Sequence, residues 1–303
     1  MKENQLTRYG AIAKSIDASI QAKVFFVGPS SADFLGDLLN TFPNDNDGVA
    51  RVVTTISAAL TNCVANRGDI IYVLPGYTQT VTAALTIDKA GVSIIGLGNG
   101  TLRPTITGNG TIDAVNITAA NVTFDNFHFA APETDDQTAA INVAGVAGVT
   151  IRNITGVGSQ TAKNVVDMIT VAAASHNLTI ENVSFYNATV AVNSFLSLEG
   201  ASTSVKVKNF KAFGPVVAGG IIDGALISDL VLEDVVIHVS GTAKAAIVLD
   251  SNPTGHALRV FAKGTVTTLA SNVNYGNALA LFEVRTAEDY SVQGAVIPAA
   301  DTE

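Results

Sequence analysis

Carboxylates at repeating intervals are the residues of this chain whose type and spacing come closest to a catalytic set. Glu199, Asp223 and Asp250 each follow a short apolar run, in FLSLEG, GIIDGA and AIVLDS. Glycoside hydrolysis generally uses two carboxylates about 5–9 Å apart. The pairs Asp223/Asp250 and Glu199/Asp223 are therefore candidate catalytic pairs. The alternation of side chains along a strand leaves open whether these carboxylates face outwards.

The other reactive residue types favour structural roles. Cys63 is the only cysteine and lies in an apolar helical pattern, which predicts a buried small hydrophobe and excludes an intrachain disulfide. Asp135-Asp136 lies in a PETDDQ loop between repeats. There is no Trp, which counts against a saccharide-binding groove. The histidines occupy unrelated repeat positions and predict no metal pair: His128, His176, His238 and His256.

These residues must be positioned by an internal repeat. Five similar blocks begin at residues 122, 149, 178, 205 and 230, at intervals of 27, 29, 27 and 25 residues: VTFDNFHF, VTIRNITG, LTIENVSF, VKVKNFKA and LVLEDVVI. A second set of apolar runs begins at 114, 140, 168, 195, 220, 246 and 278: AVNITA, AINVAG, MITVAA, FLSLEG, GIIDGA, AIVLDS and ALALFE. LRVFAKGT from Leu258 and YSVQGAVI from Tyr290 are interpreted as degenerate final turns, with Ala262 and Gly294 at the Asn position. Such a period indicates stacked supersecondary units.

The unit predicts one turn of a parallel β-helix with three short strands. Apolar residues recur at i and i+2, and Val, Ile, Thr and Asn dominate, which disfavours helical repeats. The fifth block position predicts a corner ladder with inward side chains: Asn126, Asn153, Asn182, Asn209 and Asp234. The residues just before it alternate in charge and predict pairs between adjacent turns: Asp125, Arg152, Glu181, Lys208 and Glu233.

The N-terminal region does not join the repeat. We expect residues 1–46 to form an arm and residues 47–303 to form the β-helix domain. A capping helix is expected within residues 48–66, with Asp47 as N-cap, where it would cover the open end of the stack. The arm would pack along the domain or be ordered by a partner, and its expected assembly contacts are Phe25, Phe26, Phe34, Leu38 and Phe42.

Composition restricts the possible partners. The 303 residues are 48% hydrophobic and 14% charged, yet no apolar run is long enough for a membrane span and no signal-peptide core is present at the N-terminus. The net charge is −9, and the Lys and Arg residues are scattered. We therefore expect no nucleic-acid or membrane partner and no cofactor.

The expected helix, the GDIIYVLPG strand and the VTIRNITG and LTIENVSF blocks resemble the right-handed parallel β-helix of the pectin-lyase-like superfamily over roughly residues 47–297. The stretch VFFVGPSSADFLGDLLNTFPNDNDGVARV also resembles tailed-phage particle proteins of that fold. The superfamily includes lyases, glycoside hydrolases, esterases, tailspikes and non-enzymatic virion proteins, so the resemblance implies a fold more strongly than an activity.

The enzymatic signatures of the superfamily do not carry over. The Asn-Thr-Asp, Gly-His-Gly and Arg-Ile-Lys elements of a polygalacturonase-like site are missing, and the outward acids alternate with Arg and Lys where a lyase would gather them around Ca²⁺. The sequence favours a non-enzymatic virion protein, a capsid decoration or spike-like component that forms a homotrimer and contacts capsid or other virion proteins through its arm. The alternatives are a polysaccharide-degrading tailspike or lyase, and a glycan-binding adhesin.

Overall fold

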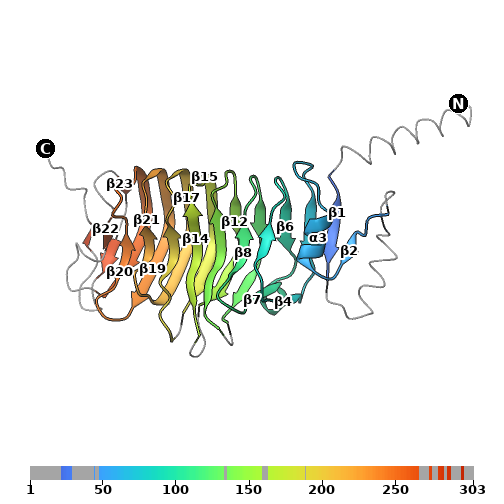
Figure 1. Cartoon of the computed structure of the whole chain (residues 1–303). Coiled ribbons are helices and arrows are strands. Elements are labelled where there is room, and N and C mark those ends of the chain that lie inside the picture. The colour runs from blue at the N-terminus through green and yellow to red at the C-terminus, as the bar shows by residue number, and fades with distance from the viewer. Residues whose placement is uncertain are drawn as a thin grey trace, which may run out of the picture.

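The chain winds into a stack of parallel strands, which Figure 1 shows from the side. The computed structural model describes residues 22–28, 44, 48–132, 135–158, 163–187 and 189–265, and the strands at 273–274, 279–282, 285–287 and 295–296. Among these residues every strand pairing is parallel except that of the last two strands. The predicted all-β parallel solenoid is therefore confirmed, and its right-handed sense stays a prediction. No helix within the described residues is long and apolar enough to cross a membrane.

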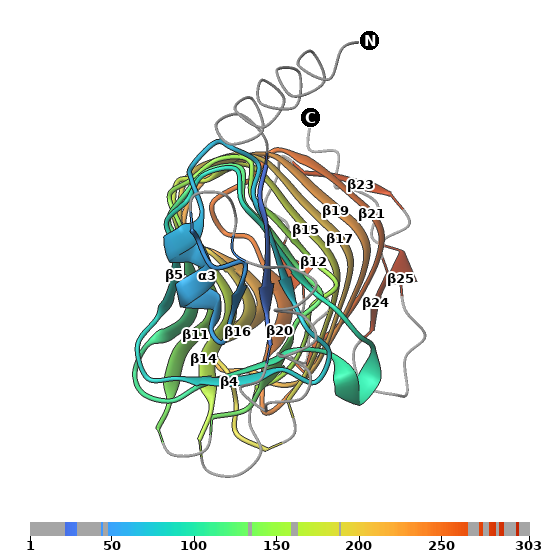
Figure 2. The ribbon, with the colours of Figure 1, turned by 90° about the vertical axis from the view of Figure 1, so that its right-hand side faces the viewer.

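Two sheets enclose the interior, and Figure 2 shows them on opposite sides of the solenoid. The eight-stranded sheet contains β5 (Leu85–Ile87), β8 (Asp113–Ile117), β11 (Gln137–Ala144), β14 (Val165–Ala173), β16 (Ser194–Leu198), β18 (Gly219–Asp223), β20 (Ala245–Val248) and β22 (Val273–Asn274). Each strand pairs with its equivalent one turn away, as Ile141 does with Val115 and Ile169.

The 17-stranded sheet contains two columns of strands that merge along the stack. One column begins with β2 (Val52–Val53), β1 (Val24–Val27), β3 (Ile70–Val73), β6 (Ser93–Gly96), β9 (Thr123–Asp125) and β12 (Thr150–Arg152). The other begins with β4 (Thr78–Val81), β7 (Thr105–Gly108), β10 (His128–Ala130) and β13 (Thr155–Val157). Long strands then serve both columns: β15 (His176–Tyr186), β17 (Ser202–Pro215), β19 (Ile227–Ser240) and β21 (Gly255–Lys263). The stack ends with β23 (Leu279–Phe282), β24 (Arg285–Ala287) and β25 (Ala295–Val296).

The core consists of apolar columns that run along the stack. At one register Phe124, Ile151 and Ile180 lie on successive turns, and Val207, Leu232 and Ala257 continue the column. All six side chains are fully buried. Because side chains alternate across a strand, the period of two in the sequence sends these residues inwards and their neighbours outwards.

The repeated Asn position forms a corner in the left-handed backbone region. The φ values of Asn126, Asn153, Asn182, Asn209 and Asp234 are 65°, 56°, 55°, 46° and 55°. The Asn182 amide donates to Asn153 Oδ1 over 3.2 Å, and the Asn209 amide donates to Asn182 Oδ1 over 2.8 Å. The side chains lie at the surface of the corner, where Asn182 and Asn209 are exposed, so the expected inward orientation is wrong. The backbone bends sharply at this corner with the Asn side chains outwards, so the interior of the solenoid is filled by the apolar residues on either side of the corner.

A second corner precedes each block and was not singled out in the sequence. Asn121, Gly148, Asn177, Ser204 and Asp229 have φ values of 57°, 72°, 53°, 56° and 58°. At Gly148 an added Cβ would lie 2.3 Å from Asn121 Oδ1. A side chain at Gly148 would therefore displace the Asn121 side chain, and the positive φ of this position also favours glycine.

The alternating charges lie in register, yet only some of them pair. Arg152 Nε lies 2.9 Å from Asp125 Oδ2, and Lys208 Nζ lies 2.6 Å from Glu233 Oε2. Glu181 lies in register between Arg152 and Lys208 and forms no ion pair within the described part of the chain. Arg259 lies on the turn after Glu233 and Asp234, and its guanidinium forms ion pairs with both of them.

The N-terminal helix is shorter than the sequence pattern predicts. Helix α3 covers Ile56–Asn62, with Thr55 as its N-cap accepting a hydrogen bond from the Ala58 amide over 3.1 Å. Val52 and Val53 form strand β2, because they pair with Phe26 and Val27 of β1. The apolar spacing that predicted one long helix therefore belongs to a strand followed by a helix. Figure 2 shows α3 at the open end of the solenoid.

Strand β1 belongs to the solenoid and not to a separate arm. Val24–Val27 pairs in parallel with Ile70–Val73 over its whole length, and Phe25 and Val27 are fully buried. The expected boundary between residues 46 and 47 therefore does not separate arm from domain.

The late turns have a different register from the predicted one. Leu230 pairs with Gly255 and Glu233 with Leu258, so the sixth block begins at Gly255 and places Arg259 at the corner, with φ 53°. The assignment of Ala262 to the Asn position was wrong, because Ala262 lies inside the core. Leu279–Phe282, within ALALFE, forms β23 in the 17-stranded sheet, and β22 takes the predicted place of ALALFE beside β20. Tyr290–Gly294 lies outside the described residues.

Candidate functional site

The outer side of the eight-stranded sheet holds the candidate carboxylate pairs. Asp223 ends β18, and its carboxylate accepts hydrogen bonds from the Ser251 amide over 3.3 Å. Burial raises the pKa of Asp223, and the charge of Asp250 on the next turn adds to this rise. Asp223 and Asp250 are therefore close enough for their charges to interact. The hydrogen bonds from the Ser251 amide link the Asp223 carboxylate to the following turn.

Glu199 lies beside this pair, but its carboxylate is hydrogen-bonded to a residue of its own strand, β16. Its carboxylate accepts a short hydrogen bond from the Ser197 hydroxyl. It also packs against Gly224, where an added Cβ would lie 2.0 Å from Glu199 Oε2. Asp223 is in register with Leu198 and not with Glu199, so the Glu199/Asp223 pair does not face across adjacent strands.

Asp167 is a further carboxylate on this sheet that the repeat pattern does not indicate. It accepts hydrogen bonds from Asn193 Nδ2 over 2.9 Å and from Ser194 Oγ over 2.6 Å. Burial raises the pKa of Asp167, and the nearby Glu199 charge contributes. Its sequence signal was weak, because it interrupts an irregular run, NVVDM, instead of repeating.

Three carboxylates of this sheet share one behaviour, unlike Glu199. Asp113 accepts a hydrogen bond from Asn142 one turn away over 2.8 Å, as Asp167 and Asp223 do from their own following turns. No group of three or more His, Cys, Asp or Glu side chains is arranged to hold a metal ion within the residues that the structure describes. Asp113, Asp167 and Asp223 therefore link neighbouring turns.

The remaining reactive groups lie apart from these carboxylates. His128 Nδ1 lies 3.0 Å from Thr155 Oγ1, which also accepts from Arg103 over 3.0 Å. Burial lowers the pKa of His128, and the positive charge of Arg103 contributes to this shift. Cys63 is buried, and this burial raises its pKa to about 12, which leaves it as an un-ionised thiol at neutral pH. Asp136 is exposed and accepts a hydrogen bond from the Asn164 amide.

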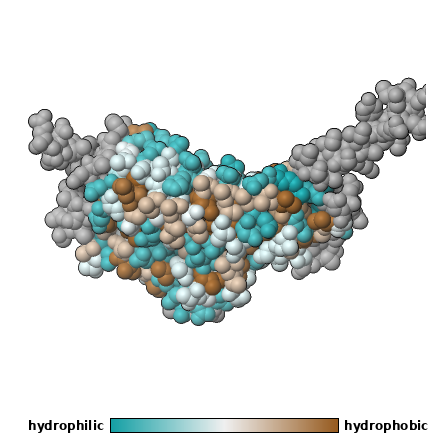
Figure 3. All heavy atoms as spheres, turned by 45° about the horizontal axis from the view of Figure 1, so that its top comes forward, coloured by the Kyte–Doolittle hydropathy of each residue, from teal (hydrophilic) through white to brown (hydrophobic). Residues whose placement is uncertain are grey.

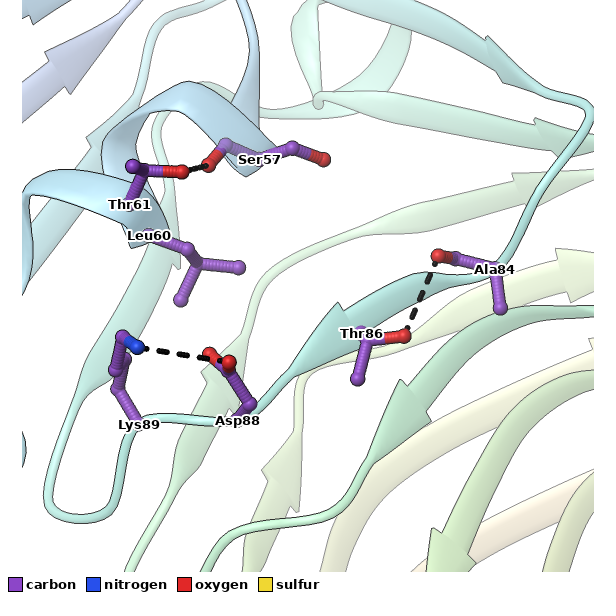
Figure 4. A pocket seen from close by; sticks show the side chains of 7 residues that line it. All are labelled: Ser57, Leu60, Thr61, Ala84, Thr86, Asp88 and Lys89. Atoms are coloured by element: carbon purple, nitrogen blue, oxygen red, sulfur yellow. Dashed lines mark hydrogen bonds and ion pairs between the residues drawn. The ribbon is translucent and has the colours of Figure 1, made fainter.

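A shallow crevice of about 320 Å³ lies between α3 and β5. Figure 4 shows its polar groups bonded to their own neighbours: Thr61 donates to the Ser57 carbonyl, and Lys89 pairs with Asp88. None of the candidate acids contributes to it. Its lining residues are Ser57, Leu60, Thr61, Ala84, Thr86, Asp88 and Lys89.

Aromatic side chains gather on the outer face of the 17-stranded sheet. Tyr186, Phe213 and His238 lie in register on β15, β17 and β19, and Phe261 lies on β21 two positions upstream of the register of His238. The rings of Phe213 and His238 meet edge to face at 6.3 Å. Tyr186 is 57% exposed, Phe213 36% and Phe261 39%. We call these four residues the aromatic strip. The repeat pattern does not indicate the strip, because Tyr186, Phe213 and His238 occupy the ninth position, just beyond the eight-residue blocks.

The expected assembly contacts have different surroundings. Phe25 is a fully buried core residue, so it is not available at the surface. Phe26 is half-buried on the outer face and stacks on Tyr72, with ring centroids 5.9 Å apart. Phe34, Leu38 and Phe42 lie outside the described residues.

Comparison with known proteins identifies the fold alone. No family model matches the sequence, and no curated protein matches it. A solved structure of pectate lyase Pel9A matches with a TM-score of 0.53 and 11% identity, covering 88% of this chain and 69% of that one. A structure of Escherichia coli YbhC matches with a TM-score of 0.49 and 12% identity, covering 86% of this chain and 84% of that one. The parallel solenoid and its similarity to a pectate lyase fit the pectin-lyase-like β-helix.

Proposed function

We propose that this protein is a non-enzymatic structural component of a tailed-phage virion, a β-helical capsid decoration or spike-like subunit. The proposal rests on the resemblance of the N-terminal sequence to tailed-phage particle proteins. It also rests on the hydrogen bonds by which carboxylates link neighbouring turns of the solenoid. The β-helix fold by itself is compatible with enzymes and with structural proteins.

The use of carboxylates as links between turns is the observation that supports a structural role best. Asp113, Asp167 and Asp223 each accept a hydrogen bond from the following turn, and Asp125 binds both Arg152 and Asn153 on the next turn. A hydrolytic site needs carboxylates free to exchange protons with a substrate. In this solenoid these groups instead hold neighbouring turns together.

The proposed partners are further copies of the chain, in a homotrimer, and capsid or other virion proteins. Attachment to the particle would use residues of the expected arm, 1–46, other than β1, since β1 is part of the stack. The proposed location is the virion surface.

The proposal is tested by quantifying the chain in purified phage particles. Particles banded by density should contain it in a fixed copy number relative to the capsid protein, and deletion of residues 1–21 should remove it from them. A phage non-structural protein from the same lysate serves as the contamination control. Presence in infected cells but absence from banded particles would overturn the proposal.

A second candidate, a polysaccharide-degrading tailspike or lyase, is favoured by one observation. Asp223 and Asp250 lie on adjacent turns, and burial together with the Asp250 charge raises the Asp223 pKa, as a general acid requires. This activity would release reducing ends or unsaturated products from host-surface glycans, and Asp250→Asn would abolish the release. Asp136→Asn, at an exposed carboxylate in a loop, is the matched control.

A further inference from the structure

We propose that Asn99 is a site of spontaneous covalent modification, at which the side-chain amide is lost through a succinimide formed with the backbone nitrogen of Gly100. The product is a mixture of aspartate and isoaspartate at this position. The inference goes beyond the proposed function, because the reaction needs only water and applies to a structural protein and to an enzyme alike.

The sequence offers two positions for this reaction. Only Asn99 and Asn109 are followed by glycine. Ring closure requires the backbone nitrogen of the next residue to reach the side-chain amide carbon, and glycine has no Cβ to obstruct that approach. The corner residues do not meet this condition, since Asn182 is followed by the β-branched Val183 and donates its amide to Asn153.

Asn99 lies in an exposed turn. It directly precedes the short 3₁₀ helix η1 (Gly100–Leu102), which projects from a corner of the solenoid in Figure 2. Asn99 and Gly100 are both exposed, and the Asn99 side chain forms no capping hydrogen bond to η1. Water is the only co-reactant, and this exposure gives it access. On the face in Figure 3 hydrophobic residues likewise lie only in small separate spots among hydrophilic ones.

The backbone around Asn99 can reach the reactive geometry. Asn99 is extended, with φ −133° and ψ 158°, so ring closure requires a rotation about ψ. Gly100 follows at φ +57°, and no atom lies within 4 Å of a Cβ added there, so the peptide can turn without a clash. The hydrogen bond from the Leu102 amide to the Asn99 carbonyl, at 3.1 Å, is the contact that this rotation must break.

Asn109 is held more firmly than Asn99. It is half-buried, and its backbone amide donates to the Val81 carbonyl over 2.8 Å. The carbonyl of Gly110 accepts from the Ile112 amide over 2.8 Å, and Asn109 takes part in at least one further interaction. The two Asn-Gly pairs are equivalent in sequence, but the structure favours reaction at Asn99.

The reaction has two steps. The Gly100 nitrogen loses its proton to water and attacks Cγ of Asn99, so that an N–Cγ bond forms while the Cγ–Nδ2 bond breaks and Nδ2 leaves with a proton as ammonia. Water then opens the ring. Addition at Cγ gives aspartate, and addition at the backbone carbonyl carbon gives isoaspartate, in which the main chain runs through the former side chain. Both products add a negative charge, and isoaspartate lengthens the backbone by one methylene.

The modification should loosen one corner of the solenoid. The Leu102 carbonyl accepts from the Gly76 amide over 2.7 Å, and it lies 2.5 Å from the position of a Cβ added at Gly98. Helix η1 is therefore closely packed on the preceding turn, and a longer backbone before it should weaken the link to Gly76. Ile94 and Ile106, on the strands before and after this turn, remain fully buried in the core.

Peptide mapping by mass spectrometry after incubation of the full chain in mildly alkaline buffer tests the proposal. In the folded chain Asn99 should convert about tenfold faster than Asn109 or more, which is a barrier difference of about 1.4 kcal/mol. In the chain unfolded in urea the two positions should convert at similar rates, because each is then an unrestrained Asn-Gly pair.

Three variants assign the product to its position. Asn99→Gln should remove it, because the longer side chain closes the ring far more slowly. Gly100→Ala should slow its formation, since the added Cβ shields the attacking nitrogen, and this variant should fold because the Cβ meets no atom within 4 Å. Asn109→Gln is the matched control and should leave the rate at Asn99 unchanged. Hydrogen exchange at the Gly76 amide should become faster in the modified chain.

The opposite results contradict the proposal. Equal conversion of Asn99 and Asn109 in the folded chain, or faster conversion of Asn109, would show that the structure does not select Asn99. An Asn99 that converts in urea but stays intact in the folded chain would show that the turn protects it. Unchanged exchange at Gly76 after modification would overturn the expected loosening of the corner.

Discussion

The side-chain amide of Asn209 donates to Oδ1 of Asn182 over 2.8 Å, and both residues adopt positive φ. One residue type therefore meets two demands at each turn. It accepts a backbone conformation that most L-residues avoid, and it links the corner to the turns above and below.

Replacement of Asn182 should separate these two contributions. Asn182→Ala should lower the free energy of unfolding by about 2–3 kcal/mol, because alanine is strained at positive φ and the ladder is cut. Asn182→Gly should cost only about 1 kcal/mol, since glycine accepts the conformation and loses only the hydrogen bonds. Urea denaturation measures both values, and equal losses would show that backbone strain is unimportant at this corner.

Asp69 should make stability depend on acid pH. Burial alone would raise its pKa, but hydrogen bonds from Arg67 and from the Lys23 and Val64 amides lower it below the ordinary value of 3.8. A lowered pKa stabilises the fold above about pH 4, and this contribution is lost as the pH falls through the folded-state value. Asp69→Asn should destabilise by about 3 kcal/mol at pH 7.

The measurement for Asp69 is the free energy of unfolding from pH 7 to pH 2 for wild type and Asp69→Asn. The difference between them should shrink below pH 4. A difference that stays constant over the whole range would contradict the assigned role of the carboxylate charge.

Asp167 should show the opposite dependence. Burial raises its pKa, so keeping it ionised costs stability, and this cost grows as the pH rises from about 4 through the folded-state pKa. Asp167→Asn can still accept the Asn193 and Ser194 hydrogen bonds through its amide oxygen. The variant should therefore be as stable as wild type or more stable at pH 7, with no advantage at pH 3. Chemical denaturation at the two pH values checks this, and a large loss at pH 7 would show that the charge itself is needed.

Gly200 should tolerate no side chain. An added Cβ would lie 2.0 Å from the Ala173 carbonyl carbon, which is backbone and cannot move aside. Gly200→Ala should cost about 3 kcal/mol or more, because the turns must separate locally. Gly100→Ala, with no atom within 4 Å and a φ of +57°, should cost only about 1 kcal/mol. Thermal unfolding compares the two, and similar midpoints would contradict the close packing at Gly200.

Local pattern and tertiary register contributed differently to what could be predicted. The blocks from Val122 to Ile237 were identified correctly because their period of two and their corner residues are local properties. The block from Gly255 was placed three residues late, because its corner residue is Arg259 and no Asn marked it. The run from Val49 to Ile56 fits a helical spacing, but pairing with β1 made a strand of Val52–Val53.

The sequence by itself determined the parallel solenoid, since alternating apolar residues at a repeat of about 25–30 positions can be buried only by stacking. The tertiary structure decided the candidate surfaces. The partners of Asp167 and Asp223 lie one turn away, 27 and 28 residues along the chain, and the aromatic strip exists only because Tyr186, Phe213 and His238 share one register. Side-chain function in a stack depends on neighbours across turns, and strand register, which is a property of the whole fold, sets those neighbours.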